Sequence, residues 1–268
     1  MTRLRSLMAL AFASVALTAC SSVETPQSNN TAEVSPQIVY GTVSAVGSRP
    51  YMVAVQRANY LTSNWCGGSL IASNWVMTAA HCVKGFSASG IKIRAGLYNM
   101  SNSSEGQTVS VSNIYIHPSY YDATYGYDIA LLKLSANVTH PYAAPGAIPS
   151  STLDSTLVQA NQMATVSGWG ITEYGSSSSQ LREVTIPITP SGTPCGGTPA
   201  NTICGPYYQG KDSCNGDSGG PLARSYNGRF YILGIVSYGP EECRGEGVYT
   251  RVGKYVSWIK SVSGVSAQ

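Results

Sequence analysis

The segment best suited to chemistry is residues 216–221, with the sequence GDSGGP, in which Ser218 lies close to glycines. Small neighbours expose a serine hydroxyl and let the backbone of a ligand come close. A serine hydroxyl is a weak nucleophile until a base removes its proton, and that base needs a carboxylate to orient it. A glycine-rich turn without a chemical role has the same local signature. The histidines and aspartates must therefore decide between the two interpretations.

The chain contains three histidines, His81, His117 and His140, and all of them precede Ser218. This excludes the serine–acid–histidine order of the α/β-hydrolases. The aspartate–histidine–serine order of the subtilisins stays open only for His140, because no aspartate precedes His81. The order histidine–aspartate–serine stays open with His81 as the base.

Local context favours His81 among the three histidines. It lies in the segment TAAHC at residues 78–82, where small residues leave room around the imidazole and a cysteine can fix the loop. His117 and His140 each precede a proline. We interpret both as histidines of loops or strand edges.

Three aspartates are candidates for the orienting acid: Asp122, Asp128 and Asp154. Asp128 introduces the apolar run 129–134, which is typical of a buried strand. An aspartate at the start of such a strand can be desolvated and held against an imidazole. Asp122 and Asp154 lie in polar segments, where we expect solvated surface charges. Asp128 is therefore the preferred acid.

The elements that must position these residues are mainly β-strands. From residue 38 onward, short β-like runs alternate with turns rich in Gly, Asn and Ser, a pattern typical of an all-β sandwich or barrel. Examples are residues 51–55, 109–112 and 230–236. Only the end predicts a helix, since Val252, Val256 and Ile259 follow the i, i+4, i+7 spacing. The Pro- and Ala-rich segment 141–151 is the expected crossing between two halves.

The composition limits the class of protein. The 268 residues include 16 Lys and Arg and 13 Asp and Glu, a net charge of +3, and 11% of residues are charged. This charge is too weak for a nucleic-acid footprint, so we expect no nucleic-acid partner. Solubility must depend on Ser, Thr, Asn, Gly and Tyr. No apolar run reaches the roughly 18–20 residues that a membrane-spanning helix needs.

The N-terminus predicts export. Residues 1–19 have a basic start and a 13-residue apolar stretch, as in a signal peptide. The stretch ends in LTAC at Cys20, which resembles the lipobox of bacterial lipoproteins, where the cysteine carries the lipid. Ordinary secretion with an incidental cysteine is the alternative. Residues 20–37 are polar and Pro-containing, so we predict a tether or propeptide without a core of its own.

The motifs together resemble those of the trypsin-like serine proteases (chymotrypsin fold, family S1), here of bacterial type because of the lipoprotein-like signal. In chain order they are TAAHC (78–82), DIALL (128–132), GWG (168–170), GDSGGP (216–221), SYG (237–239) and GVYT (247–250). The resemblance implies an all-β domain at residues 38–268, built of two antiparallel six-stranded β-barrels with a C-terminal helix. The barrels are expected at about 38–145 and 146–268, with the active site in the cleft between them.

The resemblance also implies an activity and its residues. The expected function is an exported serine endopeptidase that cuts after Arg or Lys through an acyl-enzyme. Ser218 is the implied nucleophile and His81 the general base and acid, while Asp128 holds the imidazole. The backbone N–H groups of Gly216 and Ser218 form the implied oxyanion hole. The alternative is a non-catalytic homologue that acts as a binding protein, although such proteins usually lose a member of the triad.

Specificity in this family depends on the residue six positions before the nucleophile, which here is Asp212. Its carboxylate would pair with substrate Arg or Lys at the bottom of a pocket lined by Ser237, Gly239 and Gly247. A solvated surface aspartate is the alternative. The short charged segment 240–246 follows at the pocket rim.

The rim segment leaves two possibilities open. Glu242 or Glu246 would favour basic substrates further, whereas Arg244 would compete with them if it reached towards Asp212.

A zymogen is also implied. The new amine of Ile38 would be buried against Asp217 and would order the oxyanion hole. The bond to be cut follows Gln37, where family members usually have a basic residue. Because Gln37 is not a trypsin site, we expect another protease to activate the chain.

Seven cysteines are present, and six alone allow 15 pairings. The resemblance implies the disulfides Cys66–Cys82, Cys195–Cys204 and Cys214–Cys243. Cys20 remains as the implied lipid site. No disulfide would then link residues 20–37 to the protease, so activation cleavage would also release the enzyme from its anchor.

No cofactor is expected. A hard cation needs several oxygen ligands, usually with more charge than one carboxylate supplies. The segment 99–107, where many animal trypsins bind calcium, has only Glu105, so no metal site is predicted. The expected partners are protein or peptide substrates with Arg or Lys at the cleaved position, an activating protease and protein inhibitors. We expect a monomer that is secreted, or held at the bacterial cell envelope only by a lipid on Cys20.

Overall fold

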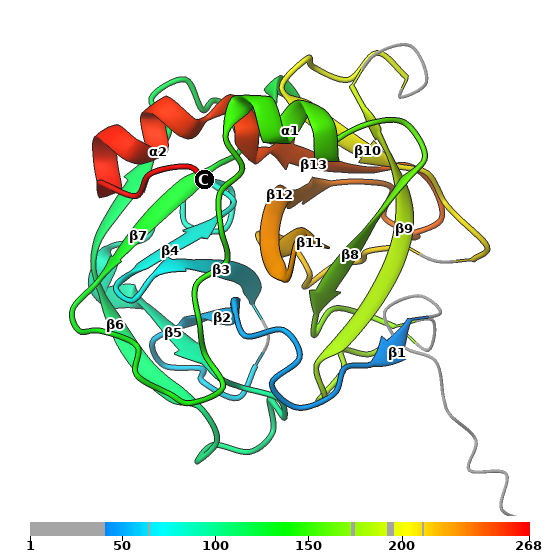
Figure 1. Cartoon of the computed structure of the whole chain (residues 1–268). Helices are drawn as coiled ribbons and strands as arrows, with labels where there is room; N and C mark the ends of the chain where they lie inside the picture. The colour runs from blue at the N-terminus through cyan, green and yellow to red at the C-terminus, as the bar shows by residue number, and fades with distance from the viewer. Residues whose placement is uncertain (1–40, 64, 173–174, 192–195, 211) are drawn as a thin grey trace, which may run out of the picture. The chain divides into compact units, whose positions relative to one another are not determined.

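Two antiparallel β-barrels make up most of the computed structural model, which describes residues 41–63, 65–172, 175–191, 196–210 and 212–268 (Figure 1). The strands of the first barrel are β2 (Met52–Arg57), β3 (Cys66–Ala72), β4 (Trp75–Thr78), β5 (Ile91–Ala95), β6 (Gln107–Ile116) and β7 (Ala130–Leu134). They close in the order β2-β3-β4-β7-β6-β5.

The second barrel also has six strands. These are β8 (Gln162–Gly168), β9 (Arg182–Pro190), β10 (Thr202–Gly205), β11 (Pro221–Tyr226), β12 (Arg229–Tyr238) and β13 (Gly247–Arg251). Their order is β9-β10-β13-β12-β11-β8, and the pairing of β8 with β9 closes the barrel. The predicted fold of two six-stranded barrels is therefore confirmed.

The burial of the strands explains why the sequence forms barrels. Most of β2 is buried on both faces. Val53 and Val55 fill the first barrel, whereas Met52 and Ala54 pack outside it against Trp169. A strand that is covered on both sides can be an uninterrupted apolar run, because alternation is needed only where one face meets water. The second barrel has its own core.

The two ends of the described chain cross to the opposite barrel. Strand β1 (Thr42–Val43) precedes the first barrel in sequence but pairs with β9 of the second. At the other end, helix α2 (Val256–Ser263) lies against β7 of the first barrel (Figure 1). Each end of the chain therefore holds the two barrels together.

The helices differ in part from the expectation. The predicted C-terminal helix is present, but it is divided into a 3₁₀ turn (Val252–Lys254) and α2, with Val252 and Ile259 buried. Helix α1 (Ser151–Leu157) was not predicted. The Ser150 hydroxyl caps it by accepting from the backbone N–H of Leu153, at 3.4 Å. Seven residues are too few to show a clear helical period in the sequence.

Asp154 on α1 is not the solvated charge that its polar neighbours predicted, and that prediction is wrong. Its side chain is 3% exposed, and Oδ2 accepts from Arg251 Nε at 2.9 Å and from Arg251 Nη2 at 2.8 Å. Burial raises the pKa of Asp154, and the pairing with Arg251 opposes this shift. Asp122, in contrast, is exposed as expected and caps the 3₁₀ turn Ala123–Tyr125. Only the folded chain brings Arg251 to Asp154.

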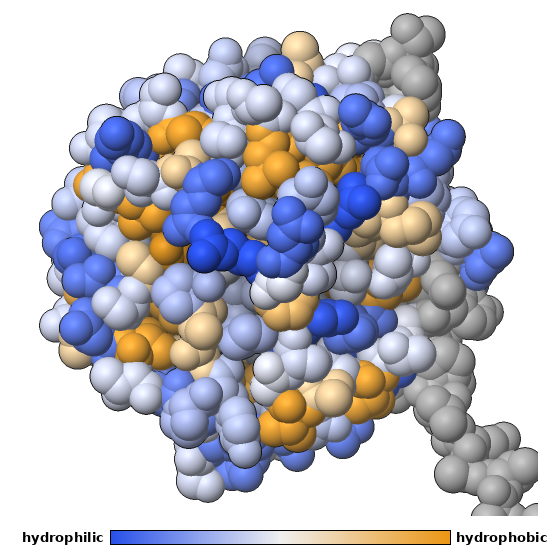
Figure 2. All heavy atoms as spheres, in the orientation of Figure 1, coloured by the Kyte–Doolittle hydropathy of each residue, from blue (hydrophilic) through white to orange (hydrophobic). Residues whose placement is uncertain are grey.

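The surface reflects the low charge of the sequence. On the face drawn in Figure 2, weakly polar residues cover much of the surface between scattered hydrophilic and hydrophobic ones. Within the described residues, no helix is both long and apolar enough to cross a membrane.

Replacing Asp154 with Ala should destabilise the fold, because it leaves the buried Arg251 without its partner. We expect the free energy of unfolding to fall by about 3–5 kcal/mol, the usual cost of breaking a buried ion pair. Urea unfolding of the two proteins measures this difference. The matched control is Asp122→Ala, which removes an exposed aspartate and should cost much less. Equal losses in the two variants would contradict a structural role of the buried pair.

Candidate active site

Asp128 is the most firmly held side chain of the site. It is fully buried at the start of β7, and its Oδ2 lies 2.7 Å from His81 Nδ1. Its Oδ1 accepts from the backbone N–H of His81 at 2.9 Å, and Ser237 Oγ donates to Oδ2 at 2.6 Å. The Thr250 hydroxyl donates to the backbone carbonyl of Asp128 at 2.9 Å. The predicted pair His81–Asp128 is therefore brought together, and strands of the second barrel hold it from the other side.

Thr250 was missed by the sequence reasoning, and Ser237 was expected only at the substrate pocket. Both lie in matched motifs, SYG and GVYT, but no spacing in the sequence connects them to Asp128. Their hydroxyls reach it only because β12 and β13 pack behind β7.

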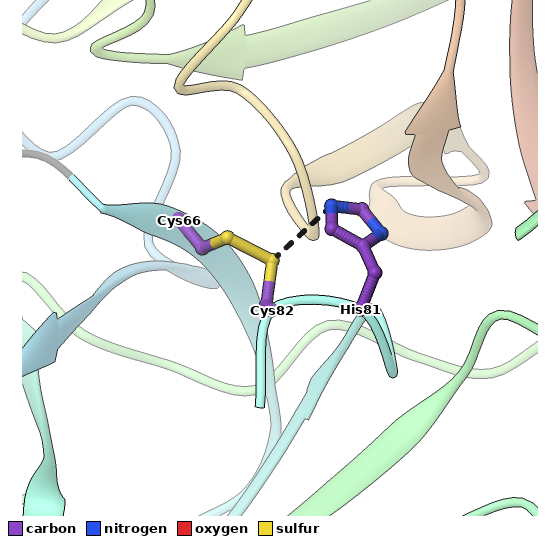
Figure 3. Close-up of side chains that lie close together, drawn as sticks. All are labelled: Cys66, His81 and Cys82. Carbon is purple, nitrogen blue, oxygen red and sulfur yellow. Dashed lines mark hydrogen bonds between the residues drawn. A yellow bond between two sulfur atoms is a disulfide. The ribbon is translucent and has the colours of Figure 1, made fainter. Parts of the chain in front are cut away.

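The imidazole of His81 is oriented for proton transfer at its other nitrogen. Because Asp128 accepts a hydrogen bond from Nδ1, Nε2 carries the free lone pair in the neutral ring. Nε2 lies 3.7 Å from Cys82 Sγ (Figure 3).

One ligand atom each of Cys66, His81 and Cys82 lies within 4.8 Å of the others, a spacing that a metal could use. The two sulfurs are bonded to each other, however, so they offer no thiolate to a metal.

The nucleophile turn is pressed closely against the first barrel. The backbone N–H of Gly67 donates to the carbonyl of Ser218 at 2.8 Å. Gly219 has φ +76°, and a Cβ there would lie 2.2 Å from Thr78 Oγ1. Only glycine fits this position. No hydrogen bond joins Ser218 Oγ to the His81 ring in this structure, as is common before a substrate is bound.

A pocket of about 220 Å³ opens beside Ser218. Its lining includes Asp212, Ser218, Ser237, Gly239 and Gly247. The structure thus brings the predicted substrate-binding residues and the predicted nucleophile to one cavity.

The carboxylate of Asp212 lies within this pocket and not on the surface. The side chain is 2% exposed, and burial raises the pKa of Asp212 to about 6. The backbone N–H of Gly245 donates to Oδ2 at 3.4 Å. A Cβ on Gly247 would lie 3.3 Å from Asp212 Oδ1, so glycine leaves the space above the carboxylate open.

Among the described residues of the pocket rim, no cation pairs with Asp212. Arg244 is exposed and forms no ion pair with Asp212, and Glu242 and Glu246 are also exposed. The disulfide Cys214–Cys243 joins this rim to the segment that precedes Ser218.

Asp217, beside the nucleophile, is a second buried carboxylate. Its Oδ1 accepts from the backbone N–H of Gly170 at 2.8 Å and its Oδ2 from that of Cys214 at 3.0 Å. Burial raises the pKa of Asp217 to about 6. Among the described residues no cation pairs with it. Its expected partner Ile38 lies outside the described part of the chain.

Two of the implied disulfides, Cys66–Cys82 and Cys214–Cys243, are formed. Cys195, needed for the third, and Cys20, the expected lipid site, lie outside the described residues.

Of the remaining histidines, His117 follows β6 and stacks on Tyr127 at 5.2 Å between ring centroids, while His140 lies in a loop. Neither contacts the acid or the nucleophile.

Comparison with known proteins gives a consistent result. A family model described as Trypsin matches residues 38–259. Serine proteinase stubble of Drosophila melanogaster is 39% identical over 83% of this chain and 30% of its own length. Trypsin Blo t 3 of Blomia tropicalis is 41% identical over 83% of this chain and 85% of its length. Ovochymase of Halocynthia roretzi is 34% identical over 88% of this chain and 16% of its length.

The chain therefore spans less than a third of the stubble proteinase and of ovochymase, but most of the Blomia tropicalis trypsin. The family match covers both barrels and every residue of the site described above. With this match and the two-barrel fold, the chain belongs to the trypsin family of serine endopeptidases.

Proposed function

We propose that this chain is an exported endopeptidase that hydrolyses peptide bonds after Arg or Lys. The observation that carries the proposal is the buried Asp212 carboxylate in the same pocket whose wall includes Ser218. A buried carboxylate is costly unless a cation or several hydrogen bonds compensate it. A substrate guanidinium or ammonium supplies that cation, whereas a Phe or Leu side chain would leave Asp212 unpaired.

The proposed reaction is supported by the contact between His81 and Asp128 and by the pocket beside Ser218. Ser218 Oγ attacks the scissile carbonyl while His81 Nε2 takes its proton, and Asp128 stabilises the resulting imidazolium through Nδ1. His81 then gives this proton to the leaving amine, which produces the acyl-enzyme. A water molecule, activated by the same nitrogen, hydrolyses the ester and frees the hydroxyl of Ser218. The backbone N–H groups of Gly216 and Ser218 stabilise the oxyanion, each by about 3 kcal/mol.

Activation by cleavage before Ile38 is part of the proposal. Asp217 is a buried carboxylate with backbone donors but no cation among the described residues, which is the environment that a new terminal amine would satisfy. Asp217 lies between Gly216 and Ser218, so pairing there fixes the oxyanion hole. Because Gln37 precedes the bond, a protease of different specificity acts as the activator.

Other features stay predictions from the sequence. They are the signal peptide at 1–19, the tether at 20–37, the lipid on Cys20 with its bacterial origin, and release from this anchor on activation. The monomeric state and inhibition by protein inhibitors are likewise proposed.

The first test is turnover by protein whose N-terminus is confirmed as Ile38. This form should hydrolyse Arg- and Lys-anilides faster than Phe- or Leu-anilides, because only the basic side chains compensate Asp212. The uncut form should be poorly active, and Ser218→Ala should lower kcat by several orders of magnitude. If the Ile38 form has no activity, the non-catalytic homologue is favoured. Activity that Ser218→Ala does not reduce would reject Ser218 as the nucleophile. Faster cleavage after Phe or Leu would reject the role of Asp212 alone.

The pKa of Asp212 predicts how binding depends on pH. Benzamidine carries an amidinium that can pair with the ionised carboxylate, so its affinity should fall about tenfold per pH unit below about pH 6. Calorimetric titration at several pH values measures this. Asp212→Asn should bind benzamidine weakly, and its affinity should not change in that pH range. Parallel pH profiles for the two proteins would show that Asp212 does not bind the cation.

The raised pKa of Asp217 predicts that the uncut protein becomes less stable as the pH rises. Its pKa in the folded state, about 6, lies above that of an unfolded aspartate. Its contribution to stability is therefore complete below about pH 4 and is lost as the pH rises through about 6. Between pH 4 and 7 the free energy of unfolding of Ser218→Ala should fall by up to about 3 kcal/mol because Asp217 loses its proton. Adding Asp217→Asn should abolish this part of the fall. Urea unfolding between pH 4 and 7 measures it, and superimposable curves would contradict the prediction.

A further inference from the structure

Arg94 is a buried cation whose partners are all backbone carbonyls. It lies on β5 and is 1% exposed. Nη1 donates to the carbonyl of Leu61 at 2.9 Å and to that of Met100 at 3.4 Å. Nη2 donates to the carbonyls of Asn102 at 2.6 Å and Glu105 at 2.7 Å. The rigid fork of a guanidinium can hold several carbonyls at once, which a lysine ammonium cannot match.

The segment that Arg94 holds is the loop at residues 97–106, which we call the Arg94 loop. Its only carboxylate, Glu105, turns back onto the start of the loop. Glu105 Oε1 accepts from the backbone N–H of Asn99 at 2.9 Å and from that of Tyr98. The loop thus has a guanidinium bonded to its carbonyls and a carboxylate bonded to its N–H groups. Its conformation is set by these two charges of the chain itself.

The Arg94 loop supports the second barrel directly. The carbonyl of Tyr98 accepts from Trp169 Nε1 at 3.1 Å and from the backbone N–H of Leu181 at 2.8 Å. The backbone N–H of Met100 donates to the carbonyl of Ser179 at 2.6 Å. Leu97 and Met100 also join Trp169 and Leu181 in a separate apolar cluster. The position of Trp169 therefore depends on the conformation of this loop.

Trp169 precedes the residue that holds Asp217. The backbone N–H of Gly170 donates to Asp217 Oδ1, and that of Ile171 donates to the carbonyl of Asn215 at 2.7 Å. Asn215 and Asp217 belong to the turn that carries the nucleophile. Hydrogen bonds, joined by short stretches of backbone, therefore link Arg94 through the Arg94 loop and Trp169 to this turn.

We propose that Arg94 is a positioning residue for the endopeptidase. By folding the Arg94 loop, it fixes Trp169 and Gly170 against Asp217 and stabilises the arrangement of the nucleophile turn that the Ile38 amine selects. This role rests on the proposed function, because it acts through the pairing of Ile38 with Asp217.

The test uses the form that begins at Ile38 and compares Arg94→Ala with the parent protein. Arg94→Ala should lower kcat/KM for an Arg-anilide about tenfold or more, since charged hydrogen bonds to buried carbonyls are lost. The alkaline limb of the pH–activity profile should also move to lower pH, because activity is lost when the Ile38 amine loses its proton. A less stable active arrangement binds the charged Ile38 amine less tightly, so it raises the pKa of this amine less.

The matched control is Lys92→Ala, which removes a cation two residues away on the same strand. It should leave both kcat/KM and the alkaline limb unchanged. A second readout is chemical rescue. Millimolar guanidinium chloride, far below denaturing concentrations, should raise the activity of Arg94→Ala relative to that of the parent at the same concentration, whereas sodium chloride should not. Arg94→Lys should show an intermediate loss without guanidinium rescue.

Each outcome decides between the claims. No turnover by the parent rejects the proposed function and with it this role. An active parent with an unshifted alkaline limb in Arg94→Ala, or no guanidinium rescue, rejects the positioning role alone. If Arg94→Ala does not fold, Arg94→Lys decides by the same alkaline limb: a downward shift supports the role, and no shift overturns it.

Discussion

The buried carboxylate of Asp128 is the interaction on which the site depends. A carboxylate without water needs several donors, and here they come from both barrels: His81 from the first and the Ser237 hydroxyl from the second. Thr250, also from the second barrel, donates to the backbone carbonyl of Asp128. The bonds from Ser237 and Thr250 form only when the barrels pack against each other. The same contact therefore orients the imidazole and closes the interface. Strand β1 and helix α2, which cross to the opposite barrels, stabilise that interface further.

Four buried aspartates show that the cost of removing a carboxylate from water can be compensated in different ways. Asp128 accepts hydrogen bonds from the protein at both carboxylate oxygens, and Asp154 pairs through Oδ2 with the guanidinium of Arg251. Asp212 and Asp217 have only backbone donors among the described residues, and burial raises the pKa of each. The first two stabilise the fold. The other two each leave a position for a cation, which the proposal assigns to the substrate and to the new N-terminus.

Much of the site was predictable because its motifs are local. Chain order and small neighbours selected His81, Asp128 and Ser218, and the structure places the first two in contact. Short apolar runs predicted an all-β chain, and the family resemblance implied two barrels. Helix α1 and the burial of Asp154 were not predicted, because one helix is too short to show a period and the aspartate's partner is 97 residues away. Similarly, Arg94 shows no sequence signal, since its partners are backbone carbonyls that any residue supplies.

The sequence by itself determined the types of reactive group, their order and the family of the fold. These properties depend on residue identity and short spacings, which are written in the chain directly. Only the tertiary structure decided which carboxylates lose their water and which partners replace it. Desolvation depends on elements that are distant in the sequence but packed together in space. For this reason the pocket around Asp212, the donors on Asp128 and the support under Trp169 emerge only when both barrels are formed.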